Sequence, residues 1–195
     1  MRGKFPCATH LVVCFQYKRD AERFREELGK RLGKFGLEVE PTKTKVMEFG
    51  RFAVQHAKRK GTKAETFDFL GLTHYCGTKR NGKGFRMKRV TARKKFVAKL
   101  KIFKEWLKKA RILKTKELWE TAKAKLRGHY NYYGVTDNLR GIMRFEWEVK
   151  KLLFKWLNRR GRRNCLNWEK FNEMLKRFPL PKPRIRVSMF GFSVN

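Results

Sequence analysis

The spacing of apolar residues changes near Thr91, and this change divides the chain into two kinds of structure. Before it, short apolar runs alternate with turn residues, a pattern typical of strands with an occasional helix. After it, apolar residues recur three or four positions apart through several segments, a pattern typical of amphipathic helices. We therefore predict an α+β chain with a mixed segment over residues 1–90, a helical domain over residues 91–178 and an extended tail over residues 179–195.

The first segment is predicted to combine short strands with one helix. Apolar or alternating runs predict strands over residues 10–16, 44–49, 67–75 and 85–90. A helix is predicted over residues 20–35, and residues 51–66 are expected to form a polar loop. The turn signal from Asn81 to Gly84 predicts that the last two strands pair as a hairpin. Core packing is expected for Phe67, Phe69 and Leu70.

The second segment is predicted to hold three long helices and a short one. The first follows Thr91 as its cap, the next two cover residues 115–133 and 139–160, and Asn167 caps the last. The proline-rich stretch after residue 178 is predicted to be extended, because proline lacks a backbone N–H. The expected inward residues are Phe96, Leu100, Phe103 and Leu107; Leu118, Ala122, Leu126 and Tyr130; Ile142, Phe145, Val149, Leu152, Leu153 and Trp156; and Trp168, Phe171 and Leu175.

Positive charge dominates the composition. The chain has 51 lysines and arginines against 17 acids, a net charge of +34, and the span from Lys79 to Lys116 contains a single acid, Glu105. Such a field attracts a polyanion whose condensed counterions are released on binding, so nucleic acid is the expected partner. A disordered basic tail is excluded, since 41% of the residues are hydrophobic and 14% aromatic.

The cysteines and the apolar runs indicate in which cellular compartment the chain is expected. The four cysteines include no Cys-x-x-Cys pair, which favours reduced thiols in a cytoplasmic protein over disulfides. A zinc site from Cys7 with His10, or from His74 with Cys76, is the weaker alternative to buried thiols beside core histidines. No signal peptide and no apolar run of about 20 residues is present, so we expect a soluble chain without membrane association.

The acidic residues give no sign of metal-dependent catalysis. Nucleotidyl transfer needs clustered carboxylates to hold divalent metals. The three aspartates, Asp20, Asp68 and Asp137, are far apart in the sequence, and a capping or surface role is expected for each. Taken alone, these residues indicate a binding module.

Five ordered blocks resemble group II intron reverse transcriptase/maturases and span nearly the whole chain. Thr66-Phe-Asp-Phe-Leu-Gly-Leu-Thr-His-Tyr75 is similar to the segment that closes the palm, and Leu126-Arg-Gly-His-Tyr-Asn-Tyr-Tyr-Gly-Val135 to the signature of the thumb, or maturase (X), domain. The other three blocks are Leu37 to Val46 with Pro41-Thr-Lys-Thr-Lys45, Leu153-Phe-Lys-Trp-Leu-Asn-Arg-Arg160 and Pro179-Leu-Pro-Lys-Pro-Arg-Ile185. The resemblance implies a truncated palm over residues 1–90 followed by an all-helical thumb domain.

The catalytic positions depart from that family. Its two metal-binding aspartates stand in a Tyr-Ala-Asp-Asp sequence, and here the four positions read Cys7-Ala8-Thr9-His10. By the same resemblance, a third aspartate, the fingers and half of the palm would precede the first residue. Thr9 and His10 cannot replace paired carboxylates, because Mg²⁺ prefers hard oxygen anions. We assign no catalytic residue, and Mg²⁺ is expected only for an intact family member or for bound RNA.

The part that remains resembles the RNA-holding half of the family. We expect it to bind structured RNA, namely a group II intron, and to assist its splicing without polymerase activity of its own. Cations would contact phosphates, while His129 and Tyr132 would stack on unpaired bases. The predicted RNA-binding residues are Arg93, Lys94, Lys95, Lys99, Arg127, His129, Asn131, Tyr132, Arg159, Arg160, Arg162 and Arg163.

Two other interpretations stay open at this stage. The chain could be the C-terminal subunit of a split reverse transcriptase, an RNA-directed DNA polymerase completed by a second chain that supplies the fingers and the first half of the palm. It could also be a decayed reading frame without a selected function. An unpaired strand edge in a truncated palm would favour a partner chain or self-association.

The departure at Thr9 and His10 predicts that the purified chain extends no primer on an RNA template with Mg²⁺ or Mn²⁺. The physical reason is the loss of paired carboxylates that would hold two metal ions. Primer extension followed on a denaturing gel measures it. Template-dependent incorporation above that of a tag-only preparation would contradict the prediction.

Overall fold

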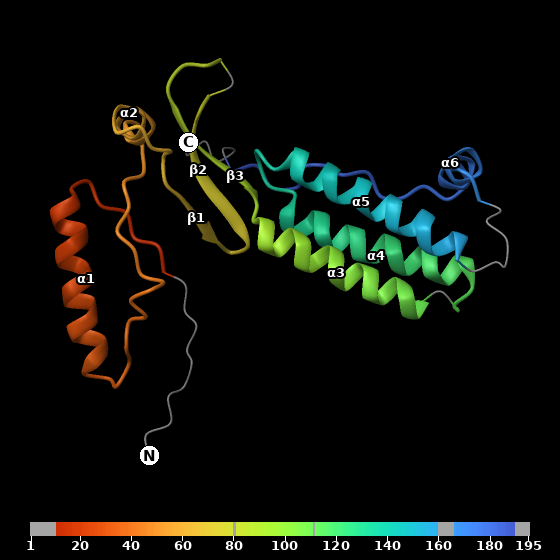
Figure 1. Cartoon of the computed structure of the whole chain (residues 1–195), viewed down its shortest axis with the longest axis horizontal. Helices are drawn as coiled ribbons and strands as arrows, with labels where there is room; N and C mark the ends of the chain where they lie inside the picture. The colour runs from red at the N-terminus through yellow and green to blue at the C-terminus, as the bar shows by residue number, and fades with distance from the viewer. Residues whose placement is uncertain (1–10, 80, 111, 160–165, 190–195) are drawn as a thin grey trace, which may run out of the picture. The chain divides into compact units, whose positions relative to one another are not determined.

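The computed structural model describes residues 11–79, 81–110, 112–159 and 166–189 (Figure 1). The elements in order are α1 (Lys18–Gly33), α2 (Ala53–Arg59), β1 (Thr66–Phe69), β2 (Leu72–Thr78), β3 (Phe85–Thr91), α3 (Arg93–Ala110), α4 (Thr115–Tyr133), α5 (Leu139–Asn158) and α6 (Trp168–Arg177). The chain divides into two compact units: residues 1–70 with 74–87, and residues 71–73 with 88–195. The six helices and three strands of the described residues confirm an α+β composition.

The strands form one three-stranded antiparallel sheet in the order β1-β2-β3. The predicted pairing of the last two runs is confirmed, but the single strand over residues 67–75 is wrong, because Leu70 and Gly71 turn the chain. Their φ angles of 48° and 77° suit a tight hairpin, in which glycine is at ease and leucine is strained. Leu70 is 62% exposed at this turn, so the expectation that it packs in the core is also wrong.

The residues before β1 hold less regular structure than predicted. The helix over residues 20–35 is confirmed as α1, whereas residues 11–15 and 44–49 lie in no strand, and α2 replaces part of the expected loop. A strand needs a neighbour that takes up its backbone N–H and C=O groups, and an apolar run does not supply one. α1 has no buried residue, and Leu11, Val12, Val13 and Phe15 are between 40% and 63% exposed.

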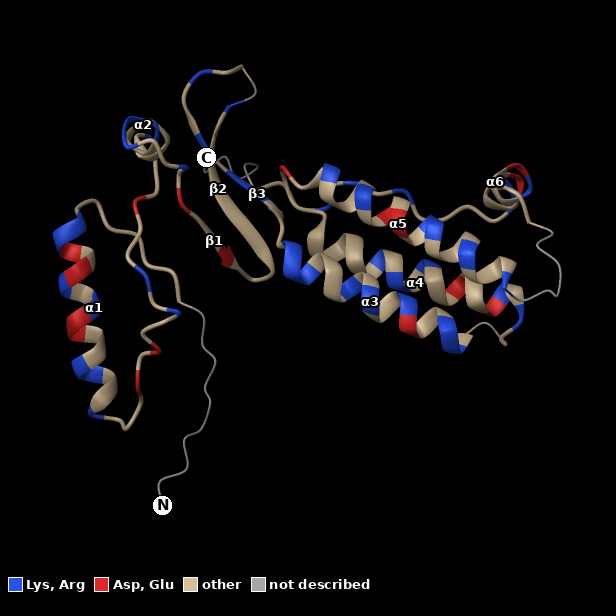
Figure 2. Cartoon of the chain, in the orientation of Figure 1, with Lys and Arg blue, Asp and Glu red and all other residues tan. Residues whose placement is uncertain are grey.

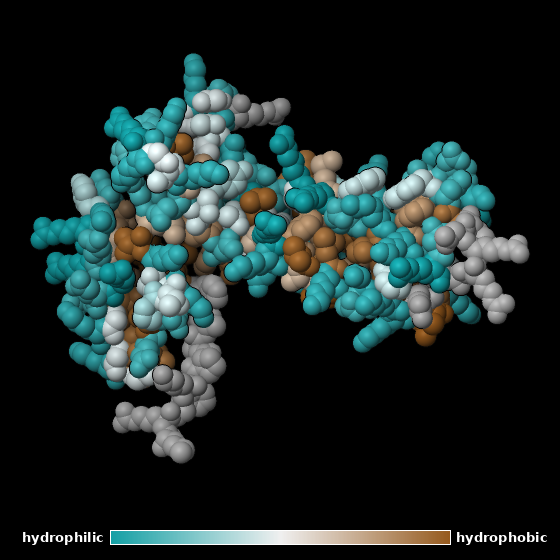
Figure 3. Space-filling model, viewed as in Figure 1, coloured by the Kyte–Doolittle hydropathy of each residue, from teal (hydrophilic) through white to brown (hydrophobic). Residues whose placement is uncertain are grey.

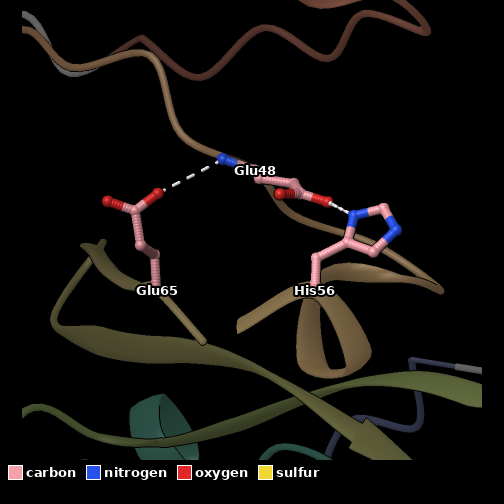
Figure 4. A network of polar contacts seen from close by, with 3 residues as sticks. All are labelled: Glu48, His56 and Glu65. Carbon is pink, nitrogen blue, oxygen red and sulfur yellow. Dashed lines mark hydrogen bonds and ion pairs between the residues drawn. The ribbon is translucent and has the colours of Figure 1, made fainter. Parts of the chain in front are cut away.

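A small polar network ties the segment around α2 together (Figure 4). The Glu48 carboxylate pairs with His56 Nδ1 on α2, and the Glu48 backbone N–H donates to Glu65 Oε2 at 3.2 Å. All three residues lie at the surface, where an ion pair contributes little to stability. We infer that the network orients this segment rather than stabilises it.

The four helices of the second unit follow their predicted positions closely. α5 packs against α3 and α4. All four predicted inward residues of α4 are buried, as are Phe103 and Leu107 of α3 and five of the six on α5, whereas Trp168 at the start of α6 is 39% exposed. Asn167 caps α6 as predicted, its Oδ1 accepting from Lys170 N at 2.9 Å. Hydrophilic side chains cover much of the visible surface of this unit, with apolar residues showing between them (Figure 3).

Residues after α6 belong to the helical unit. Trp119 Nε1 donates to the Phe178 carbonyl at 2.7 Å, Leu180 is buried in the core, and Val187 forms a parallel bridge with Val135. The Arg184 carbonyl lies so close to Gly134 that a Cβ there would be 2.8 Å from its oxygen, and it would also be 2.3 Å from the backbone oxygen of Tyr130 in the last turn of α4. The described part of the predicted tail, residues 179–189, therefore contacts the helical unit in a non-helical conformation.

A buried asparagine joins three elements of the helical unit. Asn138 is 0% exposed. Its Oδ1 accepts from Thr91 N at 2.9 Å, and its Nδ2 donates at 2.8 Å to both Thr91 Oγ1 and the Tyr133 carbonyl. Thr91 therefore ends β3 with its hydroxyl bonded to Asn138. A Cβ on Gly141 would lie 2.2 Å from Asn138 Oδ1, so this helical position needs glycine.

Replacing Asn138 by alanine is predicted to lower the free energy of unfolding by about 3 kcal/mol, since at least two buried polar groups would lose their partners. Urea denaturation of the full chain, followed by circular dichroism, measures this. Asn131→Ala is the matched control, because Asn131 is exposed on α4 and a surface change costs within about 0.5 kcal/mol. Equal midpoints for the two variants would contradict the prediction.

Candidate nucleic-acid interface

The N-terminal half of α3 presents a dense group of basic side chains. Arg93, Lys94, Lys95 and Lys99 are all exposed, and no acid occurs in α3 before Glu105. Within the part of the chain that the structure describes, none of the four forms an ion pair with a carboxylate. We call these four residues the α3 cation face; basic residues recur along α3 in Figure 2.

The α3 cation face has two flanks, because successive helical residues are rotated by about 100°. Lys95 and Lys99 are one turn apart and share a flank, Arg93 lies on the opposite flank, and Lys94 lies between the two flanks. The Lys95 Cγ and the Tyr133 hydroxyl lie 3.7 Å and 3.0 Å from the position of a Cβ built on Gly71. The charge of Lys99 acts on His129. Lys95 and Lys99 therefore border the C-terminal end of α4, which lies within residues 126–135.

Basic residues elsewhere on the helices are partly neutralised. Glu105 pairs with Lys108 at 3.0 Å, and Glu120 pairs with Lys123 at 2.8 Å. In each pair the lysine lowers the pKa of the carboxyl group, so both acids are ionised and cancel local charge. The unneutralised positive charge of α3 is thus concentrated toward its N-terminal half.

The C-terminal end of α4 supplies three of the four predicted side chains to solvent. Arg127 and Asn131 are exposed, and Tyr132 is 56% exposed with its ring 4.7 Å from that of Tyr133. Helical rotation places Arg127 and Asn131 on one side of the exposed face and Tyr132 on the other. Tyr132 therefore lies on the side of α4 that carries Lys125, which sits 5.1 Å above the Trp106 ring of α3.

His129 is buried, contrary to the exposure that its expected stacking on an unpaired base would require. It is 8% exposed, and its ring stacks on Phe145 of α5 with centroids 3.6 Å apart. Burial, with the charge of Lys99 as a smaller cause, lowers its pKa from 6.5 to about 4, so the ring is neutral at neutral pH. Its position three residues after Leu126, within the apolar stripe of α4, was the sequence signal for this outcome.

The second arginine cluster lies mostly outside the described residues. Arg159 is exposed and its guanidinium sits 4.9 Å above the Trp156 ring, which fixes it at the end of α5. Arg160, Arg162 and Arg163 fall outside the described part of the chain, as do Cys7, Thr9 and His10. The roles predicted for those six residues stay predictions.

The remaining candidate ligands are not gathered into a site. Within the described ranges, no group of three or more His, Cys, Asp or Glu side chains is placed to hold a metal ion. His74 is buried and stacks on Phe67 at 4.9 Å, as expected of a core histidine, and burial raises the pKa of the nearby Cys76 thiol. Cys14 is exposed, contrary to the expectation of buried thiols.

Two further findings concern the chain as a whole. No helix of the described residues combines the length and apolarity that crossing a membrane requires. Comparisons of the chain with protein-family models, with curated proteins and with solved structures find no match.

The depressed pKa of His129 predicts a stability that falls in acid. The unfolded chain takes up a proton near pH 6.5, before the folded chain does near pH 4. The contribution is therefore complete above the unfolded pKa and is lost as the pH falls toward the folded one. Between about pH 7.5 and about pH 5, wild type should lose about 2 kcal/mol through this group.

His129→Phe keeps a ring against Phe145 and removes the titration, so the variant should lack this part of the pH dependence. Urea midpoints of both proteins at the two pH values measure the difference. Carboxylates that titrate in the same range are common to both and cancel. Parallel losses of stability in wild type and variant would contradict a buried neutral imidazole.

Proposed function

We propose that this chain binds structured RNA, with the α3 cation face contacting phosphates and the exposed end of α4 contacting riboses and bases. The observation that carries the proposal is the set of four exposed cations that have no carboxylate partner among the described residues. Phosphates are the ligands that such a set suits, because each neutralised phosphate releases condensed counterions. A duplex presents phosphates in two rows, and the two flanks of the α3 cation face are suited to contacts on either side of one groove.

The end of α4 adds groups that distinguish RNA from a simple polyanion. Arg127 and Asn131 carry hydrogen-bonding groups suited to 2′-hydroxyls and base edges, and Tyr132 offers an aromatic plane for an unpaired base. His129 is not among the proposed RNA contacts, because its ring is buried against Phe145. It supports the interface from below by holding α4 against α5.

The identity of the RNA is proposed from the resemblance. The block from Leu126 to Val135 that is similar to the maturase signature coincides with the end of α4 beside the α3 cation face. We infer that the chain is a remnant or fragment of a group II intron reverse transcriptase/maturase. It would hold the intron RNA and assist its splicing without polymerase chemistry of its own.

A second candidate follows from the first unit. α1 buries none of its residues, and Phe24 and Phe35 are 37% and 72% exposed. A helix with an apolar stripe is ordinarily stabilised by burying that stripe. This observation favours the interpretation in which a second polypeptide covers α1 and completes a split reverse transcriptase.

The test of the RNA proposal is the salt dependence of binding. Wild type should bind a structured RNA tightly at low salt, with a log–log slope that corresponds to roughly 6–10 phosphate contacts. The triple variant Lys94→Gln, Lys95→Gln, Lys99→Gln should reduce that slope by about 2–3 and weaken all RNAs alike. Fluorescence anisotropy with a labelled RNA hairpin across a salt series measures both.

A matched variant changes three lysines that are already paired: Lys108→Gln, Lys123→Gln and Lys151→Gln, whose partners are Glu105, Glu120 and Glu148. It removes the same net charge and should reduce the slope less. Equal effects of the two triple variants would show attraction by total charge alone. A slope near zero for wild type would overturn RNA binding.

A further inference from the structure

A row of aromatic rings joins α5 to α6 in the helical unit. Trp168 of α6 stacks on Phe154 with centroids 4.3 Å apart and planes 12° apart. On its other side, Trp147 is nearly parallel to it at 6.0 Å and 13°. Trp147 and Phe154 are seven residues apart on one face of α5, so Trp168 lies between side chains two helical turns apart.

The inner end of this row is fixed and the outer end is open. Phe171 is fully buried and contacts both Phe154 and Trp168 edge to face, each with centroids 5.6 Å apart. Trp147, by contrast, is 53% exposed. The indole of Trp147 thus keeps an exposed surface while it stacks on Trp168, which is itself packed on Phe154 and Phe171.

A pocket of about 450 Å³ lies at the same place, lined by Trp147, Lys150, Trp168, Asn172 and Leu175. This volume lies in the range of small-ligand sites. Lys150 is held at the pocket by Glu146, with 3.0 Å between Nζ and Oε1. Asn172 is exposed, and its amide offers a donor pair and an acceptor, the groups that the edge of a base requires.

The charge of the chain selects among the occupants of such a pocket. α5 carries five basic residues and two acids, and the whole chain has a net charge of +34. A second copy would bring the same charge and be repelled. An unpaired nucleotide supplies both a planar ring for the indole and a phosphate for the surrounding lysines and arginines.

We propose that Trp147 is the stacking platform of a binding site for an unpaired RNA nucleotide, with Trp168 as its support and Lys150 and Asn172 at the edge of the base. The site rests on the proposed RNA-binding function but is chemically separate from the α3 cation face. The site recognises the face of a base, and in a duplex that face is covered by the neighbouring base pairs. Single-stranded segments of the RNA are therefore the ligand class that this site takes.

The experiment compares a single-stranded oligouridylate with a blunt-ended RNA duplex, in which every base is paired. Trp147→Ala should weaken oligouridylate binding about tenfold, leave duplex binding unchanged and preserve the salt slope, since no cation is removed. Trp147→Phe keeps a ring and should retain most of the affinity. Oligouridylate should also quench the intrinsic tryptophan fluorescence of wild type more than that of Trp147→Phe.

Met143→Ala is the matched control, because Met143 lies one turn before Trp147 on α5 and is 51% exposed. It should behave as wild type. An equal loss for Met143→Ala, no loss for Trp147→Ala, or Trp147-dependent binding of polyglutamate in place of oligouridylate would each overturn the site. If Trp147→Ala unfolds, Trp147→Leu is compared with Trp147→Phe, and equal affinities would overturn it.

The two proposals fail in different ways. Salt-dependent duplex binding by a chain whose Trp147→Ala variant matches wild type on oligouridylate would sink the nucleotide site and leave the RNA-binding function in place. Absence of binding to either RNA at low salt would sink both.

Discussion

The helical unit depends on one neutral side chain, the buried amide of Asn138. Just before α5 begins, this amide hydrogen-bonds to the backbone N–H and hydroxyl of Thr91, the last residue of β3, and to the carbonyl of Tyr133, the last residue of α4. Because α3 starts two residues after Thr91 and the exposed end of α4 precedes Tyr133, the same amide orients both parts of the proposed RNA interface. A hydrogen-bonded amide suits this place better than an ion pair, since a buried charge in so basic a chain would need a partner that few acids can supply. A Cβ on Gly141 would collide with the Asn138 amide, and a Cβ on Gly134 would collide with the backbone oxygens of Tyr130 and Arg184.

Positive charge is the second constraint, and the structure tolerates it by keeping the core electrically neutral. His129 lies beside Lys99 and is held in its neutral form, which avoids burying a second positive charge there. Tyr130 is also kept neutral, because burial and the charge of Glu146 raise its pKa. The helices are therefore held together by apolar and aromatic contacts, such as the stack of His129 on Phe145, and not by electrostatics. Among the described residues, Arg89 of β3 is the one buried cation, at 7% exposed. The other cations lie nearer the surface, where repulsion among them is screened by water and salt.

Helical parts of this chain could be predicted from the sequence far better than its other parts, for physical reasons. α4 begins and ends at the predicted residues because a stripe of apolar residues repeated over five turns leaves one helical solution. A strand is decided by its neighbour, so the apolar run at residues 11–15, which has none among the described residues, was mistaken for one. The hairpin at Leu70 and Gly71 was missed because leucine seldom adopts a positive φ. At the interface, the exposed lysines of α3 could be placed from the helical period. The burial of His129 could also be inferred from its place in the apolar stripe of α4. The aromatic row at Trp147 could not, because it depends on which neighbouring helix covers that flank of α5.

Binding to phosphates and binding to bases place different demands on a protein, and the helical unit meets them with different elements. Cations on a helix attract any polyanion, since the backbone of RNA is the same at every nucleotide. Discrimination needs planes and edges that meet bases, and such groups keep their orientation only when something rigid lies beneath them. Tyr132 lies against Tyr133, and Trp147 against Trp168, which is itself packed on Phe154 and Phe171. In both places an exposed ring is backed by a more buried one. An aromatic side chain that has already lost its rotamer freedom in the free protein gives up little entropy when a base stacks on it. The packing of the helices and the proposed recognition of RNA therefore follow from the same buried rings.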